Sequence, residues 1–305
     1  MVGAPFRTAL APDLLAGKTA WITGGGTGLG RAMALRFAEL GASVALSGRQ
    51  HQPLEETVAQ VRARGARAAH ASCDVREPDA VESALSRIEK ELGPVDILVN
   101  NAAGNFLCPS EDLTPNGFAS VVGIVLHGTF HCTLAAARRW IPSGRTGAVL
   151  NIVTTYAWTG SAWVLPSACA KAGVLALTRS LAVEWARHRI RVNAIAPGPI
   201  PTEGAFSRLL PTEDLLELRR KRIPAGRFGV PEELAELAAF LVSDAADWIR
   251  GEVVTLDGGE WLKGAGEFND LLDLPPETWD ALRARSGRIR KRKTPAPGPP
   301  MEDPT

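Results

Sequence analysis

The chain has 305 residues, of which 45% are hydrophobic and 22% charged, the composition of a globular protein with enough apolar side chain for a large core. Its formal net charge of +1 excludes the strong overall field that suits a nucleic-acid or membrane-surface binder. No apolar run of 18 residues free of charge stands out, so we expect no membrane-spanning helix.

The N-terminus and the cysteines indicate the compartment. MVGAPFRTALAPDLLAGK lacks the charged start and the long apolar centre of a secretory signal. The cysteines show no CxxC or Cys/His spacing, so we expect reduced thiols, no metal site and a cytoplasmic location. They are Cys73, Cys108, Cys132 and Cys169.

Strand-like and helix-like segments alternate along the chain. Several predicted strands are apolar throughout, as expected where helices cover both faces of a sheet. The strand–helix–strand repetition predicts a parallel sheet with right-handed crossovers. The predicted strands are Thr19–Thr23, Ser43–Ser47, Arg67–Cys73, Asp96–Asn100, Ala148–Val153, Arg191–Ile195 and Val253–Leu256, and the predicted helices are Arg31–Leu40, Leu54–Arg64, Asp79–Leu92, Phe118–Trp140, Ala168–Ala186 and Glu232–Val242.

The composition predicts one domain followed by a tail. No linker-like change appears before about residue 287, so we expect residues 1–287 to form a single domain. RIRKRK (Arg288–Lys293) leads into a proline-rich end, and we expect residues 288–305 to be disordered. The alternative is a basic arm that binds the phosphates of a ligand or polyanion.

A glycine-rich turn, TGGGTGLG, follows the first predicted strand and opens the first predicted helix. Gly24, Gly28 and Gly30 fit a GxxxGxG spacing, with Thr27 and Leu29 beside them. Glycine lets the backbone approach a pyrophosphate closely, and a helix N-terminus offers the anion free N–H groups. We therefore predict a dinucleotide site here; the alternative is a purely structural turn.

The end of the second predicted strand, SVALSGRQ, bears on which dinucleotide binds. An NAD site usually has an acidic residue here for the ribose hydroxyls, but this chain has Ser47 and Arg49. A guanidinium with a neighbouring hydroxyl suits a 2′-phosphate, so we predict NADPH as the cofactor. The alternative for Arg49 is an ordinary surface arginine.

Two further strand ends carry predicted cofactor contacts. After the third strand, we expect Asp74 to accept from the adenine amine and Val75 to form an apolar wall. After the fourth strand, NNAAGN brings Asn101 and Ala102 to a place where a backbone must lie against the cofactor.

Together TGGGTGLG, NNAAGN, Lys171, NAIAPGPI and LDGG resemble the short-chain dehydrogenase/reductase family over residues 18–260. The resemblance implies an α/β fold with a single-domain, Rossmann-type, doubly wound sheet of seven parallel strands and helices on both faces. It also implies a homotetramer.

The place of the tyrosine narrows the resemblance. In this family a catalytic tyrosine usually stands four residues before the lysine, but LPSACAK has Ser167 there. The single tyrosine of the chain, Tyr156, lies 15 residues before Lys171, just after the fifth predicted strand. This arrangement resembles the mitochondrial-type 2,4-dienoyl-CoA reductases.

The resemblance implies a role for each site residue. Tyr156 would be the acid at the thioester carbonyl and Asn105 its partner at the same oxygen. Lys171 would bind the nicotinamide ribose, and Ser167 would hydrogen-bond the ribose or the nicotinamide. Pro197, Gly198 and Ile200 would wrap the nicotinamide, while Arg49, Arg76, Phe106, Thr114 and Arg208 would bind the acyl-CoA.

The implied reaction is the NADPH-dependent reduction of 2,4-dienoyl-CoA to 3-enoyl-CoA in the oxidation of unsaturated fatty acids. The alternatives are a carbonyl or alcohol oxidoreductase of the 3-oxoacyl thioester type and a catalytically silent relative that binds a dinucleotide. We expect a nearby ammonium to favour the anion of Tyr156. One departure is His127, which stands where the family commonly has asparagine and is either a water-holding group or a packed helix residue.

Overall fold

The computed structural model describes residues 8–202 and 212–286. The chain divides into two compact units, Met1–Trp261 and Leu262–Thr305, which we describe separately. The boundary expected near residue 287 lies where the described part of the chain ends, so the domain division made from the sequence stays a prediction.

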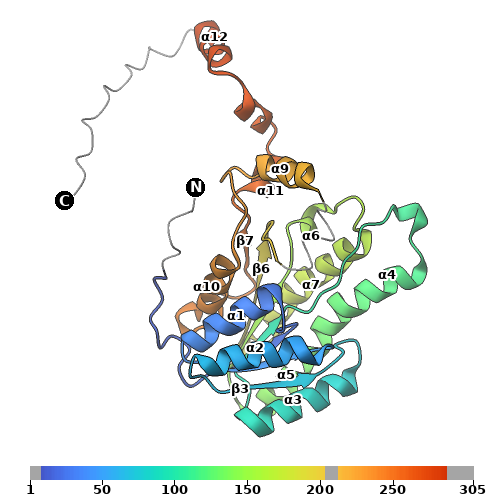
Figure 1. Cartoon of the computed structure of the whole chain (residues 1–305), viewed down its shortest axis with the longest axis vertical. Helices are drawn as coiled ribbons and strands as arrows, with labels where there is room; N and C mark the ends of the chain where they lie inside the picture. Colours follow the sequence, from blue (N-terminus) through green and yellow to red (C-terminus); the bar gives the residue numbers. More distant parts are fainter. Residues whose placement is uncertain (1–7, 203–211, 287–305) are drawn as a thin grey trace, which may run out of the picture. The chain divides into compact units, whose positions relative to one another are not determined.

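The first unit is built on one seven-stranded parallel sheet (Figure 1). The order β3-β2-β1-β4-β5-β6-β7 reverses direction at β1, as in doubly wound α/β folds, and confirms the predicted fold class. Two strands coincide with the predicted ones, and the others differ by one or two residues at an end. The strands are β1 (Thr19–Thr23), β2 (Ser43–Gly48), β3 (Ala68–Ser72), β4 (Ile97–Asn100), β5 (Gly147–Ile152), β6 (Ile190–Pro197) and β7 (Val253–Leu256).

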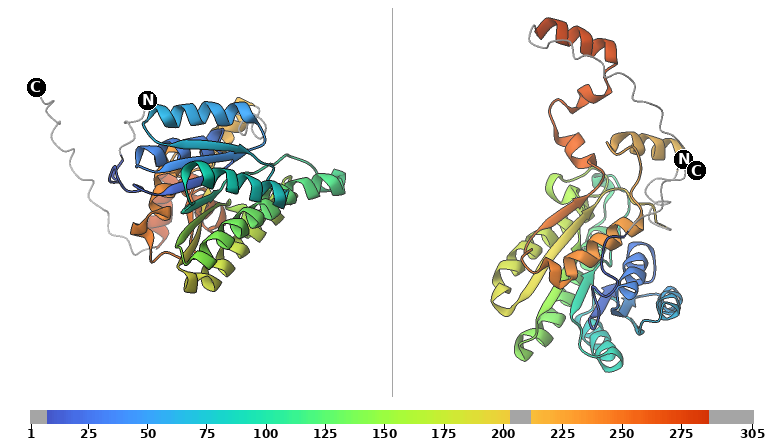
Figure 2. Two further views of the ribbon diagram at one scale, coloured as in Figure 1. Left: turned by 90° about the horizontal axis from the view of Figure 1, so that it is seen from below. Right: turned by 90° about the vertical axis from the view of Figure 1, so that its left-hand side faces the viewer.

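Helices cover both faces of this sheet (Figure 2). In β1, Ala20 and Ile22 join a core cluster with α1, α2 and α10, whereas Trp21 joins a second cluster with α3 and α5. Because both faces are buried, the strand is apolar throughout. The helices of this unit include α1 (Gly28–Glu39), α2 (His51–Ala63), α3 (Pro78–Leu92), α4 (Pro115–Val122), α5 (Gly128–Ser143), α6 (Tyr156–Thr159), α7 (Leu165–Glu184), α9 (Glu213–Arg222) and α10 (Pro231–Val242), with short turns η1 (Ser110–Asp112), η2 (Gly123–His127), η3 (Ala186–His188) and η4 (Asp244–Ala246).

A continuous helical stretch, Pro115–Ser143, joins α4, the π-helical turn η2 and α5. Its length and apolar composition would allow it to cross a membrane, contrary to the expectation from the sequence. The core helix of a soluble protein can have the same length and apolar composition, so one such helix does not identify a membrane protein. Here Val125, Cys132 and Trp140 are buried in the core clusters.

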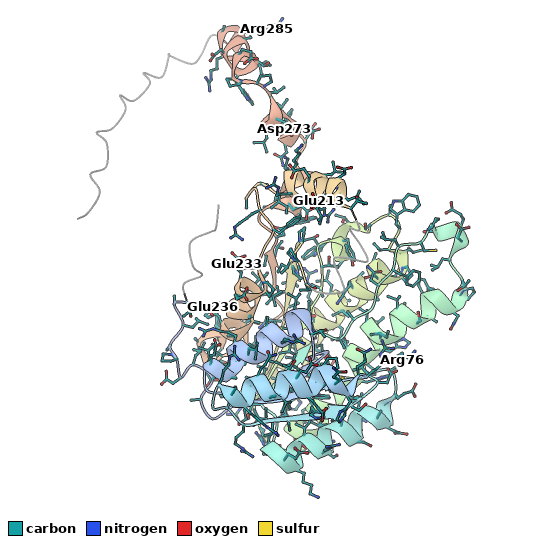
Figure 3. The ribbon with its side chains drawn as sticks, in the orientation of Figure 1. Arg76, Glu213, Glu233, Glu236, Asp273 and Arg285 are labelled. Carbon is teal, nitrogen blue, oxygen red and sulfur yellow. The ribbon has the colours of Figure 1, made fainter. Side chains whose placement is uncertain are left out.

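The second unit contains η5 (Asn269–Asp273) and α12 (Pro276–Ser286), while α11 (Glu260–Ala265) begins just before the division. Asn269 Nδ2 donates to the carbonyl oxygen of Leu262 at 2.8 Å and so joins the two ends of the connecting turn. Asp273 and Arg285, labelled in Figure 3, belong to this unit.

Candidate active site

A cleft of about 420 Å³ lies at the carboxyl ends of β1 to β4. Here the strand order reverses, and ligands of open α/β sheets bind at such a point. The walls come from the glycine turn, the start of α2, and the segments that follow β3 and β4. Of the predicted cofactor residues, the cleft is lined by Gly24, Thr27, Gly28, Leu29, Arg49, Asp74, Val75, Asn101 and Ala102.

The glycine turn fits a pyrophosphate. Gly24 and Gly28 have φ angles of +64° and +51°, which side chains rarely adopt. A Cβ on Gly30 would lie 2.2 Å from the carbonyl oxygen of Gly24, so α1 can approach the turn only with glycine there. Because α1 begins at Gly28, its first N–H groups have no helical acceptor and are available to an anion.

Hydrogen bonds join the glycine turn to the end of β4. Thr23 Oγ1 accepts from the backbone N–H groups of Asn101 and Ala102, each at 3.0 Å. Asn101 Nδ2 donates to the carbonyl oxygens of Thr23 and Gly24 at 3.0 and 3.2 Å. Asn101 therefore shapes the cleft through the backbone of the turn.

Ser47 and Arg49, at the end of β2, were predicted to bind the cofactor together, but their side chains lie in different environments. Arg49 is exposed and lines the cleft, as a 2′-phosphate ligand requires. Ser47 is fully buried, and its Oγ accepts from Trp21 Nε1 at 2.9 Å. The predicted contact between the Ser47 hydroxyl and the cofactor is corrected: the side chain faces the core, and the Ser47 carbonyl oxygen accepts from Gly24 N at 2.7 Å.

Asp74 and Arg76 form an ion pair after β3, with Arg76 Nη2 2.6 Å from Asp74 Oδ2 (Arg76 is labelled in Figure 3). The Arg76 guanidinium, with a smaller contribution from Arg49, holds the pKa of Asp74 below its ordinary value against the opposing effect of burial. The guanidiniums of Arg49 and Arg76 therefore act on the Asp74 carboxylate, while Glu77 also acts on Arg76.

The hydroxyl of Tyr156 lies 3.0 Å from Ser167 Oγ. Tyr156 begins α6, soon after β5, and Ser167 lies in the first turn of α7. Lys171 follows one turn later, on the same face of the helix as Ser167. The Tyr156 hydroxyl therefore lies beside Ser167, the residue four positions before Lys171.

Burial sets the protonation of both groups. Lys171 donates from Nζ to the carbonyl oxygen of Ile152 at the end of β5, and burial lowers the pKa of Lys171 to about 8. Burial raises the pKa of Tyr156, although its hydrogen bonds to Ser167 and Thr154 oppose that shift. The expectation that an ammonium would favour the anion of Tyr156 is therefore corrected, because desolvation is the larger effect. Tyr156 is a neutral phenol at neutral pH, able to donate a proton.

Asn105 lines the cleft beyond β4, and its Oδ1 accepts from the backbone N–H of Phe106 at 2.9 Å. We find no acceptor for Asn105 Nδ2 within residues 8–202 and 212–286, so the amide is available as a donor. A bond from Cys108 N to the Trp163 carbonyl oxygen, at 2.8 Å, ties the loop after Asn105 to the loop before α7.

Two of the predicted acyl-CoA residues meet at Gly117. Thr114 Oγ1 accepts from Gly117 N at 3.0 Å and caps α4, so its hydroxyl has a structural role. The Phe106 ring lies 3.4 Å from the place of a Gly117 Cβ and is partly exposed. Arg208 lies outside the described residues. The acyl-CoA contacts of all three stay predictions.

The run Pro197–Ile200 follows the end of β6 and contacts the end of the neighbouring strand β7. Gly198 N donates to the Leu256 carbonyl oxygen at 2.9 Å, and a Cβ on Gly198 would lie 2.6 Å from Asp257 Cβ. Pro197 ends the strand, and Ile200 is buried. The chain then reaches Thr202, which lines the cleft and lies 3.3 Å from the place of a Gly28 Cβ. Thr202 was not predicted, because only the tertiary fold returns this loop to the glycine turn.

His127 is exposed at the end of η2, with its ring centroid 6.3 Å from that of His131. It is therefore not a packed helix residue, and it does not line the cleft. Its exposure gives no support to a water-holding role.

A contact between two tryptophans was not predicted from the sequence. Trp158 stacks on Trp261 with ring centroids 5.2 Å apart. The Trp261 backbone N–H donates to Asp257 Oδ2 at 2.8 Å, which ties the start of α11 to the segment after β7. The partners are more than 100 residues apart in sequence, so no local pattern could have shown the contact.

The chain is similar to known proteins of one family. A family model described as enoyl-(acyl carrier protein) reductase matches residues 24–260. A Bacillus subtilis protein named a probable (2E)-enoyl-CoA-producing 2,4-dienoyl-CoA reductase is 50% identical over 246 residues, which cover 80% of this chain and 97% of that protein. A Caenorhabditis elegans protein named probable (3E)-enoyl-CoA-producing 2,4-dienoyl-CoA reductase 3 is 41% identical over 289 residues, 92% of this chain and 94% of the relative. The crystal structure of a short chain dehydrogenase from Bacillus anthracis aligns with a TM-score of 0.73 and 45% identity, covering 80% of this chain and 96% of that one. The chain therefore belongs to the short-chain dehydrogenase/reductase family of oxidoreductases.

Proposed function

We propose that the protein is an NADPH-dependent 2,4-dienoyl-CoA reductase that forms 3-enoyl-CoA in the oxidation of unsaturated fatty acids. The observation that carries this proposal is the 3.0 Å contact between the Tyr156 hydroxyl and Ser167 Oγ. It supplies a phenol to a site in which serine occupies the usual tyrosine position. The names of the relatives from Bacillus subtilis and Caenorhabditis elegans support the same substrate class.

The choice of NADPH depends on the end of β2. Arg49 is exposed at the cleft, and no acidic side chain occupies residues 47–50 to repel a 2′-phosphate. A guanidinium binds phosphate through charge-assisted hydrogen bonds. Lys171 would hold the nicotinamide ribose, and the run Pro197–Ile200 would lie against the nicotinamide, so the cofactor would extend from the glycine turn towards Tyr156.

When bound, NADPH supplies a hydride to C5 of the conjugated thioester. The charge that develops on the thioester oxygen needs preorganised donors, each worth about 2.7–4 kcal/mol. The neutral phenol of Tyr156 and the amide of Asn105 are two donors of this kind. Lys171 adds positive potential in its protonated form.

The site of protonation determines the product. A proton added at C2 gives 3-enoyl-CoA, and one added at C4 gives 2-enoyl-CoA; the names of the two relatives differ on this point. We favour the 3-enoyl product, because a phenol bonded to the thioester oxygen is closer to C2 than to C4.

We also propose that the protein acts in the cytoplasm as a homotetramer, with an acyl-CoA thioester as substrate and no nucleic-acid partner or membrane insertion. The small net charge and the family support this assignment. In the stretch Pro115–Ser143, the burial of α5 against the sheet supports a core role for that helix.

The experiment combines purified protein with NADPH and a 2,4-dienoyl-CoA, follows the loss of both absorbances, and locates the remaining double bond by NMR. We expect turnover and a 3-enoyl product. Turnover of 3-oxoacyl-CoA without turnover of the dienoyl substrate would instead identify a carbonyl reductase. NADPH binding without turnover of either substrate would identify a silent relative.

A further inference from the structure

A cluster of metal-ligating side chains lies outside the active site, between α2 and β3. His51 begins α2, Glu55 follows one turn later, and His70 lies in β3, the edge strand of the sheet. Figure 1 shows α2 and β3 side by side at this edge. One candidate ligand atom from each residue lies within 4.8 Å of the other two.

Two of the three ligands come from one face of α2. Residues four apart on a helix are neighbours on its surface, and His51 Nδ1 lies 3.1 Å from Glu55 Oε2. Both side chains are exposed, so both can rotate towards a shared ion.

His70 provides the third ligand. Its Nδ1 is buried and has no hydrogen-bond partner among the described residues, which is unusual for a buried polar atom.

A cavity of about 350 Å³ beside the cluster leaves room for an ion and a water molecule. Two acidic and two basic side chains line it, and one pair of them, Arg87 and Glu91, forms an ion pair at 3.3 Å. Arg62 Nη2 donates to the Ala68 carbonyl oxygen at 2.8 Å. A hard cation such as Ca²⁺ or Mg²⁺ needs more oxygen ligands than this wall offers. Imidazole nitrogens suit Zn²⁺, Ni²⁺ and Cu²⁺ instead.

We propose that His51, Glu55 and His70 form a binding site for a divalent transition-metal ion, with Zn²⁺ as the best match. Two imidazole nitrogens and a carboxylate oxygen, with water in the fourth tetrahedral position, are a common zinc ligand set. Metal–ligand bonds of about 2.0–2.1 Å place tetrahedral ligand atoms about 3.4 Å apart, so atoms that now lie within 4.8 Å of one another must approach by at most about 1.4 Å. The bound ion ties the first turn of α2 to the edge strand, two residues after Arg49. This site goes beyond the proposed function and does not depend on it.

The test uses the full chain carrying Cys169→Ser, which removes an exposed thiol that would also bind Zn²⁺. After treatment with a chelator, the protein is titrated with ZnCl₂ in a calorimeter, and its Tm is measured with Zn²⁺, Mg²⁺ and Ca²⁺. We expect saturable binding of one Zn²⁺ to this site and a rise in Tm with Zn²⁺ alone. His51→Gln and Glu55→Gln, both at exposed positions, should each weaken Zn²⁺ binding about tenfold or more.

His70→Asn should have the same effect, and the two exposed variants keep the proposal testable if that protein does not fold. The matched control is His188→Gln in η3, outside the cluster, which should bind Zn²⁺ as the parent does. Absence of saturable Zn²⁺ binding would overturn the proposal. So would equal affinity in the parent and the two exposed variants.

Discussion

The hydroxyl of Tyr156 stands 3.0 Å from Ser167 Oγ, although the two residues belong to different helices. The short helix α6 ends at Gly160, whose φ of +71° lets the chain turn back towards α7. The Tyr156 hydroxyl therefore lies beside a side chain that stands one helical turn before Lys171.

Ser167→Ala removes the partner that orients the phenol. We expect kcat with the dienoyl substrate to fall about threefold to tenfold, because a neutral hydrogen bond contributes about 0.5–1.5 kcal/mol. The effects of Ser167→Ala and Tyr156→Phe should not add in the double variant, since both remove the same interaction. Additive losses in this cycle would show that the two side chains act separately. Ser161→Ala, in the exposed loop before α7, is the control.

Arg49→Ala tests the choice of cofactor. We expect the Kd for NADPH to rise about tenfold to a hundredfold, the effect of losing a charge-assisted bond of about 1.5–3 kcal/mol, while the Kd for NADH stays the same. Fluorescence titration with each cofactor measures both values. Arg64→Ala, at the end of α2, should change neither. Equal losses for the two cofactors would reject a 2′-phosphate contact.

Asn105→Ala tests the second donor at the thioester oxygen. Loss of one oxyanion donor typically costs about 2.7–4 kcal/mol, so kcat should fall about a hundredfold or more while NADPH affinity changes little. Asn116→Ala, on the exposed start of α4, is the matched control. A kcat within threefold of the parent value would exclude Asn105 from the reaction.

Lys171→Met tests the electrostatic cost of the buried lysine. Its pKa falls from 10.5 to about 8 on folding, so the unfolded chain binds more protons between these pH values. The free energy of unfolding should therefore rise with pH across that window and carry a penalty of about 3 kcal/mol below pH 8.

Urea unfolding of the parent and of Lys171→Met at several pH values measures this effect. The variant should lose the rise between pH 8 and 10.5 and be inactive, whereas Lys90→Met, on the exposed face of α3, should keep both the rise and the activity. An unchanged rise in Lys171→Met would refute the assignment.

The fold could be predicted from the sequence because its strands are short apolar runs between turn residues. Thr19–Thr23 and Val253–Leu256 were predicted with their true ends. The start of α2 was placed at Leu54 rather than His51, because the apolar spacing begins only at Leu54 and the first turn is polar.

The site was readable where function depends on local motifs, as at the glycine turn. The sequence did not show towards which face of a strand a given side chain points. Ser47 was assigned to the cofactor, but both faces of β2 are covered, so its sequence gave no sign that the hydroxyl bonds Trp21. Thr202 reaches the cleft through the loop after β6, and no local pattern describes that contact.

The most direct measurement compares the single-turnover rate of the parent with that of Tyr156→Phe, at saturating NADPH and 2,4-dienoyl-CoA. If the phenol relocated beside Ser167 supplies the donor at the thioester oxygen, the rate should fall about a hundredfold while the Kd for NADPH is unchanged. A Tyr156→Phe rate within threefold of the parent would contradict this account.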